Sequence, residues 1–154
     1  YLKQSTQKLP LLIADLKGDV IDQILEEENI REIKSYIHAP GYIANTDLAA
    51  LYCGAFAFLY PSLRESFGIP MLEAMACGTP IIAGNTSAMP EIAGEGALLA
   101  DPFNSNDITE NILQLEYDQT LYQQQVEYGI QRSQLFSWRN TAESLLKIYK
   151  EFAK

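Results

Sequence analysis

The sequence is short of positive charge. It holds 11 lysine and arginine residues against 20 aspartate and glutamate residues, which gives a net charge of −9. Arg64 is the only lysine or arginine between Lys34 and Arg132. So few cations suit neither the phosphates of a nucleic acid nor an anionic membrane surface, and we expect no nucleic-acid partner and no direct membrane binding. A bound diphosphate would depend mostly on backbone N–H groups, or on cations from outside these residues.

Cysteine is also scarce, and no apolar run reaches the roughly 18 residues that a membrane span needs. Cys53 and Cys77 lie in apolar stretches, so we expect two buried thiols in a reducing compartment rather than a disulfide framework. The 154 residues, 47% of them hydrophobic, predict one domain with its own core. Because the chain starts at Tyr1 rather than at a methionine, we expect it to be a piece of a longer protein.

Strand and helix patterns alternate along most of the chain. Apolar runs predict buried strands at residues 9–14 and 55–60, and further strands at 33–37, 79–84 and 97–100. Helical patterns cover residues 19–29, 48–52 (after a start signal at 45–47) and 70–77. A short helix capped by Ser87 and three helices after Asp107 follow, while residues 1–8 resemble the end of a helix. The alternation predicts an α/β fold: a Rossmann-like parallel sheet of at least five strands flanked by helices, with a helical C-terminal segment.

The last predicted helix has an apolar side. Its apolar residues are expected to face inward, with Trp138 as a packing anchor, and they are Leu145, Leu146, Ile148 and Tyr149.

The stretch from Glu65 to Gly78 is the strongest candidate for a site. A strand precedes it, and Pro70 suits the first turn of the following helix because the missing N–H would have no partner there. Gly78 is a typical residue just after a helix. The helix start should therefore lie at the carboxyl edge of the sheet, where α/β folds bind ligands and where free N–H groups favour phosphate.

Glu73 is the only charged residue between Glu65 and Glu91. Its helix is predicted to lie close on the sheet, and burying a lone carboxylate costs several kcal/mol unless something donates hydrogen bonds to it. Two interpretations stay open. Glu73 is a structural residue satisfied by backbone N–H groups or by solvent, or it accepts hydrogen bonds from the hydroxyls of a sugar or ribose. The single histidine, His38, ends a strand and is more often incidental than catalytic at such a position.

Residues 61–80, PSLRESFGIPMLEAMACGTP, resemble the signature of the group 1 glycosyltransferases (glycosyltransferase family 4), whose mark is two glutamates separated by seven residues. Further segments at 40–43, 47–52, 81–83, 90–92, 97–102 and 136–138 fall in the family's order, so the similarity covers roughly residues 10–152. The resemblance implies a GT-B fold, with two Rossmann-like domains across a cleft. Residues 1–154 would form the C-terminal, nucleotide-sugar-binding domain, truncated at its N-terminus and without the acceptor domain.

The resemblance also implies an activity. The enzyme would be a retaining, metal-independent hexosyltransferase that moves a sugar from a UDP- or GDP-sugar to an acceptor hydroxyl in polysaccharide or glycoconjugate biosynthesis. It would need no cofactor, and its partner would be the N-terminal acceptor-binding domain of the same enzyme. We expect it in the cytoplasm, with any membrane association made through the missing domain.

Each part of the donor would have its own contacts. By the resemblance, Glu65 is the catalytic residue, and it also binds the sugar together with the N–H groups of Phe67, Gly68 and Ile69. The N–H groups of Met71 and Leu72 would bind the diphosphate, and Glu73 would bind the ribose. The base would contact Ile37, His38 and Gly41. No metal ligand is expected.

Two departures limit what this chain should do alone. The family's glycine turn and Arg/Lys pair, which neutralise the diphosphate, would precede Tyr1, so we expect weak donor binding and no catalysis by this chain. Asp15 stands at a strand end where the family usually has glycine. Two other functions stay open: a non-catalytic nucleotide-sugar-binding or interaction domain on the same scaffold, and a GT-B-like nucleotide-sugar epimerase. The epimerase would need acidic and histidine residues in the cleft that the sequence does not supply.

Overall fold

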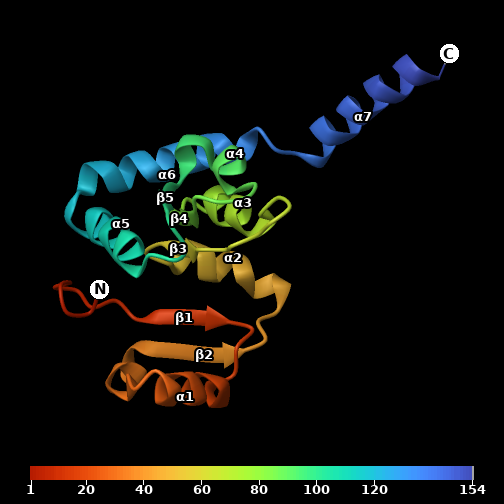
Figure 1. Cartoon of the computed structure of the whole chain (residues 1–154). Coiled ribbons are helices and arrows are strands. Elements are labelled where there is room, and N and C mark those ends of the chain that lie inside the picture. Colours follow the sequence, from red (N-terminus) through yellow and green to blue (C-terminus); the bar gives the residue numbers. More distant parts are fainter. Residues whose placement is uncertain (154) are drawn as a thin grey trace. The chain divides into compact units, whose positions relative to one another are not determined.

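The computed structural model describes residues 1–153, in which short parallel strands alternate with helices (Figure 1). The elements in chain order are β1 (Leu11–Ala14), α1 (Gly18–Glu27), the 3₁₀ helix η1 (Arg31–Tyr36), β2 (Ile37–Gly41), α2 (Asn45–Gly54), β3 (Phe58–Tyr60), α3 (Ile69–Ala76), β4 (Ile81–Gly84), α4 (Met89–Ala93), the 3₁₀ helix η2 (Gly94–Gly96), β5 (Leu98–Ala100), α5 (Ser105–Tyr117), α6 (Gln119–Gln134) and α7 (Trp138–Phe152). The predicted α/β class is confirmed.

Contacts group the chain into two compact units, and the first runs from Tyr1 to Leu51. Its strands β1 and β2 pair in parallel, with Leu12 opposite His38. Helix α1 packs beside β2 and buries Ile21 and Leu25, which are four residues apart and therefore share one face of the helix.

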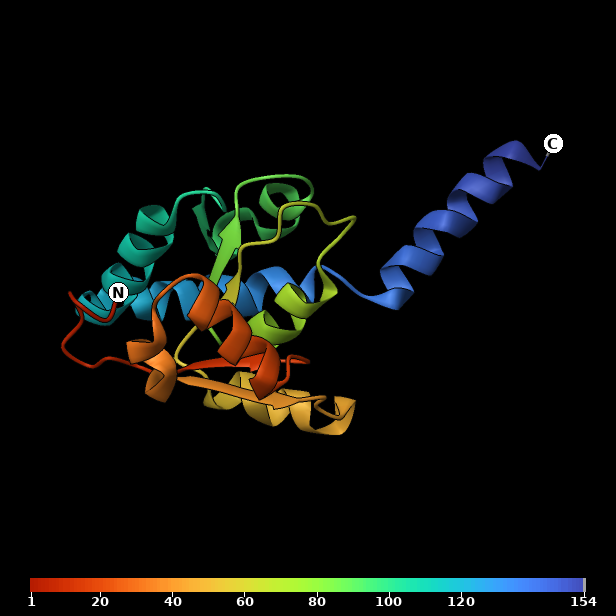
Figure 2. The same cartoon turned by 60° about the horizontal axis from the view of Figure 1, so that its bottom comes forward.

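The second unit begins at Tyr52 and holds a three-stranded parallel sheet in the order β3-β4-β5. The central strand β4 is buried along its whole length. Its neighbouring residues Ile81 and Ile82 belong to two different core clusters, because successive side chains of a strand point to opposite faces of the sheet. The cluster of Ile81 includes residues of α3, and the cluster of Ile82 includes residues of α5. Figure 2 shows the same helices and strands turned by 60°. The sheet is thus covered on both faces.

The prediction of one sheet with at least five strands is wrong. The five strands pair as a two-stranded and a three-stranded sheet. An apolar run indicates that a segment is extended, but its neighbour is chosen by tertiary pairing, which leaves no local signal in the sequence. Nor is β1 buried as predicted, since Leu11 and Leu12 are 41% and 46% exposed.

Two local predictions in the first unit are also wrong. Residues 1–8 form turns and not the end of a helix, because the Ser5 hydroxyl accepts hydrogen bonds from the backbone N–H groups of Gln7 and Lys8. The strand expected at 33–37 is mostly the 3₁₀ helix η1. Ile33 and Tyr36 are its half-buried residues, and a spacing of three matches the period of a 3₁₀ helix.

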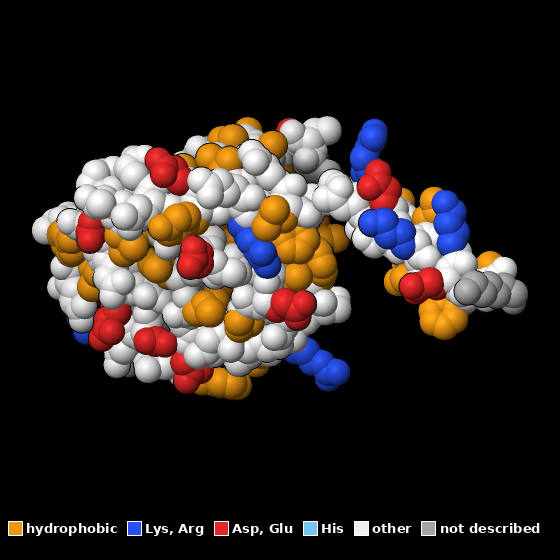
Figure 3. Space-filling view, turned by 90° about the horizontal axis from the view of Figure 1, so that it is seen from above, with side chains coloured by type: hydrophobic (Ala, Val, Ile, Leu, Met, Phe, Trp, Pro, Cys, Tyr) orange, Lys and Arg blue, Asp and Glu red, His pale blue; other side chains and the backbone are white. Residues whose placement is uncertain are grey.

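Helix α7 forms where predicted, but its apolar side chains are not inward. Leu145, Leu146, Ile148 and Tyr149 are between 45% and 65% exposed, and Trp138 is 83% exposed. In Figure 3 hydrophobic side chains lie uncovered along this helix beside lysine and arginine. The predicted packing role of Trp138 is therefore wrong within the described residues: an apolar helix face does not by itself supply the surface that would cover it.

The two cysteines form no disulfide, as expected, but they are not buried: Cys53 is exposed and Cys77 half-buried. Each stands at the C-terminal end of a helix, Cys53 in the last turn of α2 and Cys77 at the C-cap of α3. No helix among residues 1–153 combines the length and the apolar character required to cross a bilayer.

Candidate functional site

The loop from Pro61 to Gly68 joins β3 to α3 and carries Glu65 (Figure 2). The Tyr60 hydroxyl, at the end of β3, donates a hydrogen bond of 2.8 Å to Oε1 of Glu65. The Ser62 hydroxyl donates a second one, 2.9 Å long, to the same oxygen. No hydrogen bond from residues 1–153 reaches the other oxygen, Oε2. The carboxylate is thus held on one side and can accept a ligand hydroxyl on the other.

Ser87 fixes the backbone of the same residue. Its Oγ accepts a hydrogen bond from the Glu65 N–H at 3.2 Å and donates one to the Glu65 carbonyl at 2.6 Å. Ser87 has a left-handed backbone, with φ at +57°, which is uncommon for a serine. Its predicted role as a helix cap is wrong, because the N-cap of α4 is Ala88, without a side-chain cap.

Gly68 lies at the start of α3, and a non-glycine residue would be strained there. Its φ is +97°, in the left-handed region, and an added Cβ would lie 2.6 Å from Cε of Met89. Met89 is fully buried, so it has little room to move. Within the described residues, no hydrogen bond takes up the N–H groups of Phe67, Gly68 or Ile69. Three backbone donors near the positive end of a helix dipole therefore follow Glu65.

The N–H group of Met71 already has a partner, because it donates to the Gly68 carbonyl at 3.1 Å. A diphosphate oxygen at Met71 would have to share this donor. The next residue, Leu72, is half-buried in the first turn of α3. The Phe67 side chain packs edge-on against Phe136, with 5.7 Å between ring centroids. This contact ties the loop to the segment that follows α6.

Glu73 lies on the exposed side of α3, so the expectation that its carboxylate is buried is wrong. Glu73 also has a protein partner in Tyr52. Burial and then the negative charge of Glu73 raise the pKa of the Tyr52 phenol, which lies close to that carboxylate. The local pattern misled because α3 has only eight residues and its buried side is made by Met71, Ala74 and Met75. Water and Tyr52 can satisfy Glu73 without a ligand.

Burial, followed by the hydrogen bond to Glu65, raises the pKa of Tyr60 to about 12 from 10.0. The Tyr60 phenol is therefore protonated at neutral pH and acts as a donor. Because the folded protein keeps this proton more tightly than the unfolded chain, Tyr60 stabilises the fold fully below pH 10 and loses that effect as pH rises to about 12.

The variant Tyr60→Phe should therefore lose less stability than the wild type between about pH 10 and about pH 12. Urea unfolding at a series of pH values measures this difference. The two proteins should show the same pH dependence at neutral pH. Parallel curves across the whole alkaline range would contradict the assignment of this titration to Tyr60.

The residues predicted to contact the base lie in the first unit. Ile37, His38 and Gly41 all belong to β2, where Ile37 is half-buried, His38 exposed and Gly41 buried. Gly41 has φ at +83° and its carbonyl accepts the N–H of Asp15 at 2.9 Å. Asp15 itself has φ at +61°, so the turn keeps a left-handed backbone where the family resemblance expects glycine.

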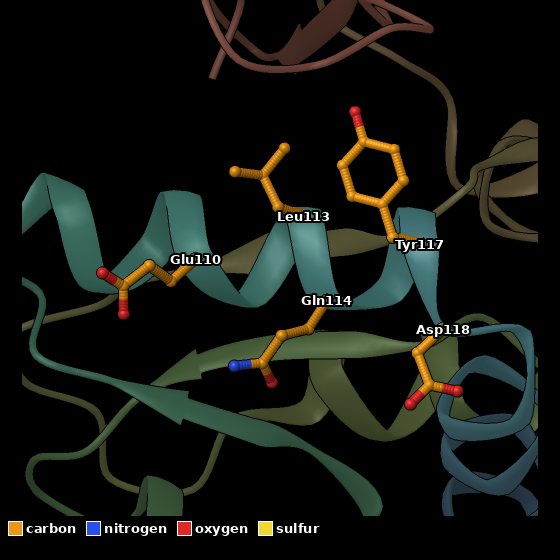
Figure 4. A pocket seen from close by; sticks show the side chains of 5 residues that line it. All are labelled: Glu110, Leu113, Gln114, Tyr117 and Asp118. Carbon is orange, nitrogen blue, oxygen red and sulfur yellow. The ribbon is translucent and has the colours of Figure 1, made fainter.

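A shallow hollow along α5 lies elsewhere in the second unit. It is lined by Glu110, Leu113, Gln114, Tyr117 and Asp118. Figure 4 shows Leu113 and Tyr117 on one side of the helix, with Gln114 and Asp118 directed to the other. None of the predicted site residues lines it. Among residues 1–153, no group of three His, Cys, Asp or Glu side chains is placed to hold a metal ion.

Sequence reasoning identified Glu65 but missed the residues that hold it: Tyr60, Ser62 and Ser87. Tyr60 ends an apolar run and counts there as a strand residue. Ser87 follows Glu65 by 22 residues, and only the parallel pairing of β3 with β4 brings the loops after these strands together. The one local signal for these partners was a tyrosine, Tyr60, at the end of the apolar run and five residues before Glu65.

The chain was also compared with known proteins. A model of the family "Glycosyl transferases group 1" matches residues 1–132. O-antigen chain mannosyltransferase B of Escherichia coli is 35% identical over 150 residues, which are 96% of this chain and 39% of that protein. The chain thus spans about two fifths of the length of this relative.

Solved structures that resemble the chain include the following two. The C-terminal domain of a glycosyl transferase group 1 family protein (LpcC) from Francisella tularensis has 26% identity and a TM-score of 0.71, and the match covers 87% of this chain and 72% of that one. The Anabaena Alr3699/HepE structure in complex with UDP has a TM-score of 0.83, 19% identity, and a match over 97% of this chain and 43% of that one. The second likeness concerns the fold alone.

Proposed function

Because the chain belongs to the group 1 glycosyltransferases, we propose that it is the C-terminal, donor-binding half of a retaining, metal-independent enzyme of glycosyltransferase family 4. The enzyme moves a hexose from a nucleotide-diphospho-sugar to an acceptor hydroxyl. The observation that carries this proposal is the Glu65 carboxylate, held on one oxygen by Tyr60 and Ser62. It is followed by three N–H donors, just before and at the start of α3, that have no hydrogen-bond partner within residues 1–153.

This arrangement suits a ligand in which a neutral sugar is joined to an anionic diphosphate. Oε2 of Glu65 accepts a hydrogen bond from a sugar hydroxyl, and the N–H groups of Phe67, Gly68 and Ile69 donate to sugar oxygens. The positive end of α3, including the N–H groups of Met71 and Leu72, favours the diphosphate and the charge that grows on it as the glycosidic bond breaks. We assign the ribose to Glu73 and the base to Ile37, His38 and Gly41.

We propose mannose as the first sugar to test and GDP-mannose as its donor, because the chain resembles the O-antigen chain mannosyltransferase B and the serotype-specific mannosyltransferase WbdA of Escherichia coli. Those names also favour a role in the assembly of a surface polysaccharide, with the donor taken from the cytoplasm. Since the chain spans 39% of the first relative, we assign the acceptor site to a separate domain of the same polypeptide.

Glu73→Ala tests the ribose assignment in the full-length protein. Loss of a carboxylate that accepts from ribose hydroxyls should weaken GDP binding about tenfold, the effect of one charge-assisted hydrogen bond. Calorimetry with GDP and 2′-deoxy-GDP measures it. The wild type should prefer GDP, and the variant should bind both nucleotides equally.

Glu127→Ala is the matched control, because Glu127 is another exposed helical glutamate, on α6, outside the proposed site. It should bind GDP as the wild type does. If Glu73→Ala also keeps the wild-type preference for GDP, then Glu73 is a structural residue satisfied by Tyr52 and water, and the ribose assignment falls.

A further inference from the structure

Two hydroxyl groups, that of Tyr60 at the end of β3 and that of Ser62 in the following loop, converge on a single oxygen of Glu65. We propose that Tyr60, assisted by Ser62, is a positioning residue: it fixes Oε1 of Glu65 and thereby presents Oε2 to the donor sugar in one orientation. This inference rests on the proposed function, because it assumes that Glu65 contacts the sugar.

One donor, Tyr60, ends the strand before the Glu65 loop, and the other, Ser62, lies in that loop. The Tyr60 hydroxyl lies 2.8 Å and the Ser62 hydroxyl 2.9 Å from Oε1, which are ordinary lengths for O–H···O bonds. A carboxylate oxygen has about two lone-pair sites, so two donors occupy this oxygen fully. A ligand hydroxyl therefore meets Oε2, unless it displaces Tyr60 or Ser62.

The Tyr60 ring is itself fixed. It stacks on Phe58 with 5.5 Å between ring centroids and planes 22° apart, and Tyr60 pairs with Ala83 of the buried strand β4. It also lines the left-handed turn at Gly68, where an added Cβ would lie 3.6 Å from Cε1 of Tyr60. The hydroxyl is thus held by a strand rather than by the loop that it supports.

A glutamate on a loop has three side-chain torsions and loses considerable rotamer entropy when it is fixed. Tyr60 and Ser62 fix Glu65 before the ligand arrives, so a sugar does not have to order it on binding. Without the Tyr60 hydroxyl, the carboxylate should rotate, and the sugar part of the donor should bind less well. The nucleotide part should be unaffected.

The experiment uses Tyr60→Phe in the full-length protein, because phenylalanine keeps the ring and removes only the hydroxyl. Dissociation constants are measured by calorimetry for GDP-mannose and GDP, and for UDP-glucose and UDP. In each pair, the dissociation constant of the sugar nucleotide is divided by that of the nucleotide. This ratio isolates the effect of the sugar and rises when the sugar part binds less well. We expect Tyr60→Phe to raise this ratio between about 3- and 10-fold for the sugar nucleotide that the protein uses, with nucleotide binding unchanged within about twofold.

Tyr122→Phe is the matched control. The Tyr122 hydroxyl donates to the backbone carbonyl of Phe56 at 3.2 Å and makes no hydrogen bond to Glu65. It should lower stability much as Tyr60→Phe does and leave the ratio at the wild-type value. Glu65→Gln should raise the ratio by itself, and adding Tyr60→Phe to it should change the ratio no further, because the two residues act as one unit.

The outcomes separate the inference from the proposed function. If Glu65→Gln raises the ratio and Tyr60→Phe does not, Glu65 binds the sugar but needs no positioning by Tyr60, and this inference alone is overturned. If Glu65→Gln leaves the ratio at the wild-type value for both pairs, Glu65 does not contact the sugar and both proposals fall. A fall in nucleotide binding equal to the fall in sugar-nucleotide binding would show that Tyr60→Phe disturbs the whole site, and would also overturn the inference.

Discussion

Glu65→Gln in the full-length protein should lower kcat/KM for sugar transfer by about 100-fold, the loss expected from one strong charge-assisted hydrogen bond in the transition state. Glutamine has the same shape, and its carbonyl oxygen can still accept from Tyr60 and Ser62. Its amide nitrogen then replaces Oε2, and a donor group would face the sugar hydroxyl where an acceptor is needed. Steady-state transfer rates with GDP-mannose and with UDP-glucose measure the loss.

Glu127→Gln removes one negative charge from α6 and should keep the wild-type rate, which controls for the change in net charge. The unfolding free energy of Glu65→Gln should stay within about 1 kcal/mol of the wild type, since the side chain is only half-buried. Wild-type activity in Glu65→Gln would refute the role of Glu65. A wild-type protein that binds the sugar nucleotide but transfers nothing would favour a non-catalytic binding domain on the same scaffold.

Gly84→Ala should destabilise the protein by about 1–3 kcal/mol, the usual cost of overpacking a rigid site. Gly84 is the last residue of β4, and a Cβ there would lie 2.7 Å from the backbone carbonyl oxygen of Ser62. The same carbonyl accepts a hydrogen bond from the Thr86 hydroxyl at 3.3 Å. The backbone cannot step aside as a flexible side chain could, so the Ser62 segment must shift.

This shift should also move the Ser62 hydroxyl away from Glu65, so we expect donor binding to weaken about tenfold, the effect of one lost hydrogen bond to a charged group. Urea denaturation measures the stability, and calorimetry with GDP-mannose measures the binding. Gly54→Ala is the matched control, because a Cβ at Gly54 has no heavy atom within 4 Å and should change stability by about 0.5 kcal/mol or less. Equal stability of the two variants would show that the chain accommodates a side chain at Gly84.

Local features of this protein were predictable where short-range physics decides them. Pro70 stands in the first turn of α3, and Gly78 follows the helix with φ at +74°, both as predicted from the residue types. The run at Ile81 predicted a strand, and β4 forms there. The run at residues 55–60 predicted a strand buried on both faces, but β3 is only half-buried and the fully buried strand is β4.

Other features depended on contacts between distant residues. Glu73 is an isolated charge in an apolar helix, and its exposure follows from which side of α3 meets the core. The segment at Ile33 was expected to be a strand but is a 3₁₀ helix, in which its two half-buried residues, three apart, share one side. In these cases several local structures were compatible with the same pattern, and packing chose between them.

The sequence by itself determined the α/β class, the family and the position of Glu65 in the loop before a helix, since each of these follows from residue types at short spacing. Only the tertiary structure decided how the five strands pair and what holds the Glu65 carboxylate. Tyr60 holds the carboxylate from five residues away, whereas Ser87 holds the Glu65 backbone across 22 residues, a contact that exists only after β3 and β4 have paired. A hydrogen-bond partner far away in sequence is fixed by the fold and leaves no periodic trace in the chain.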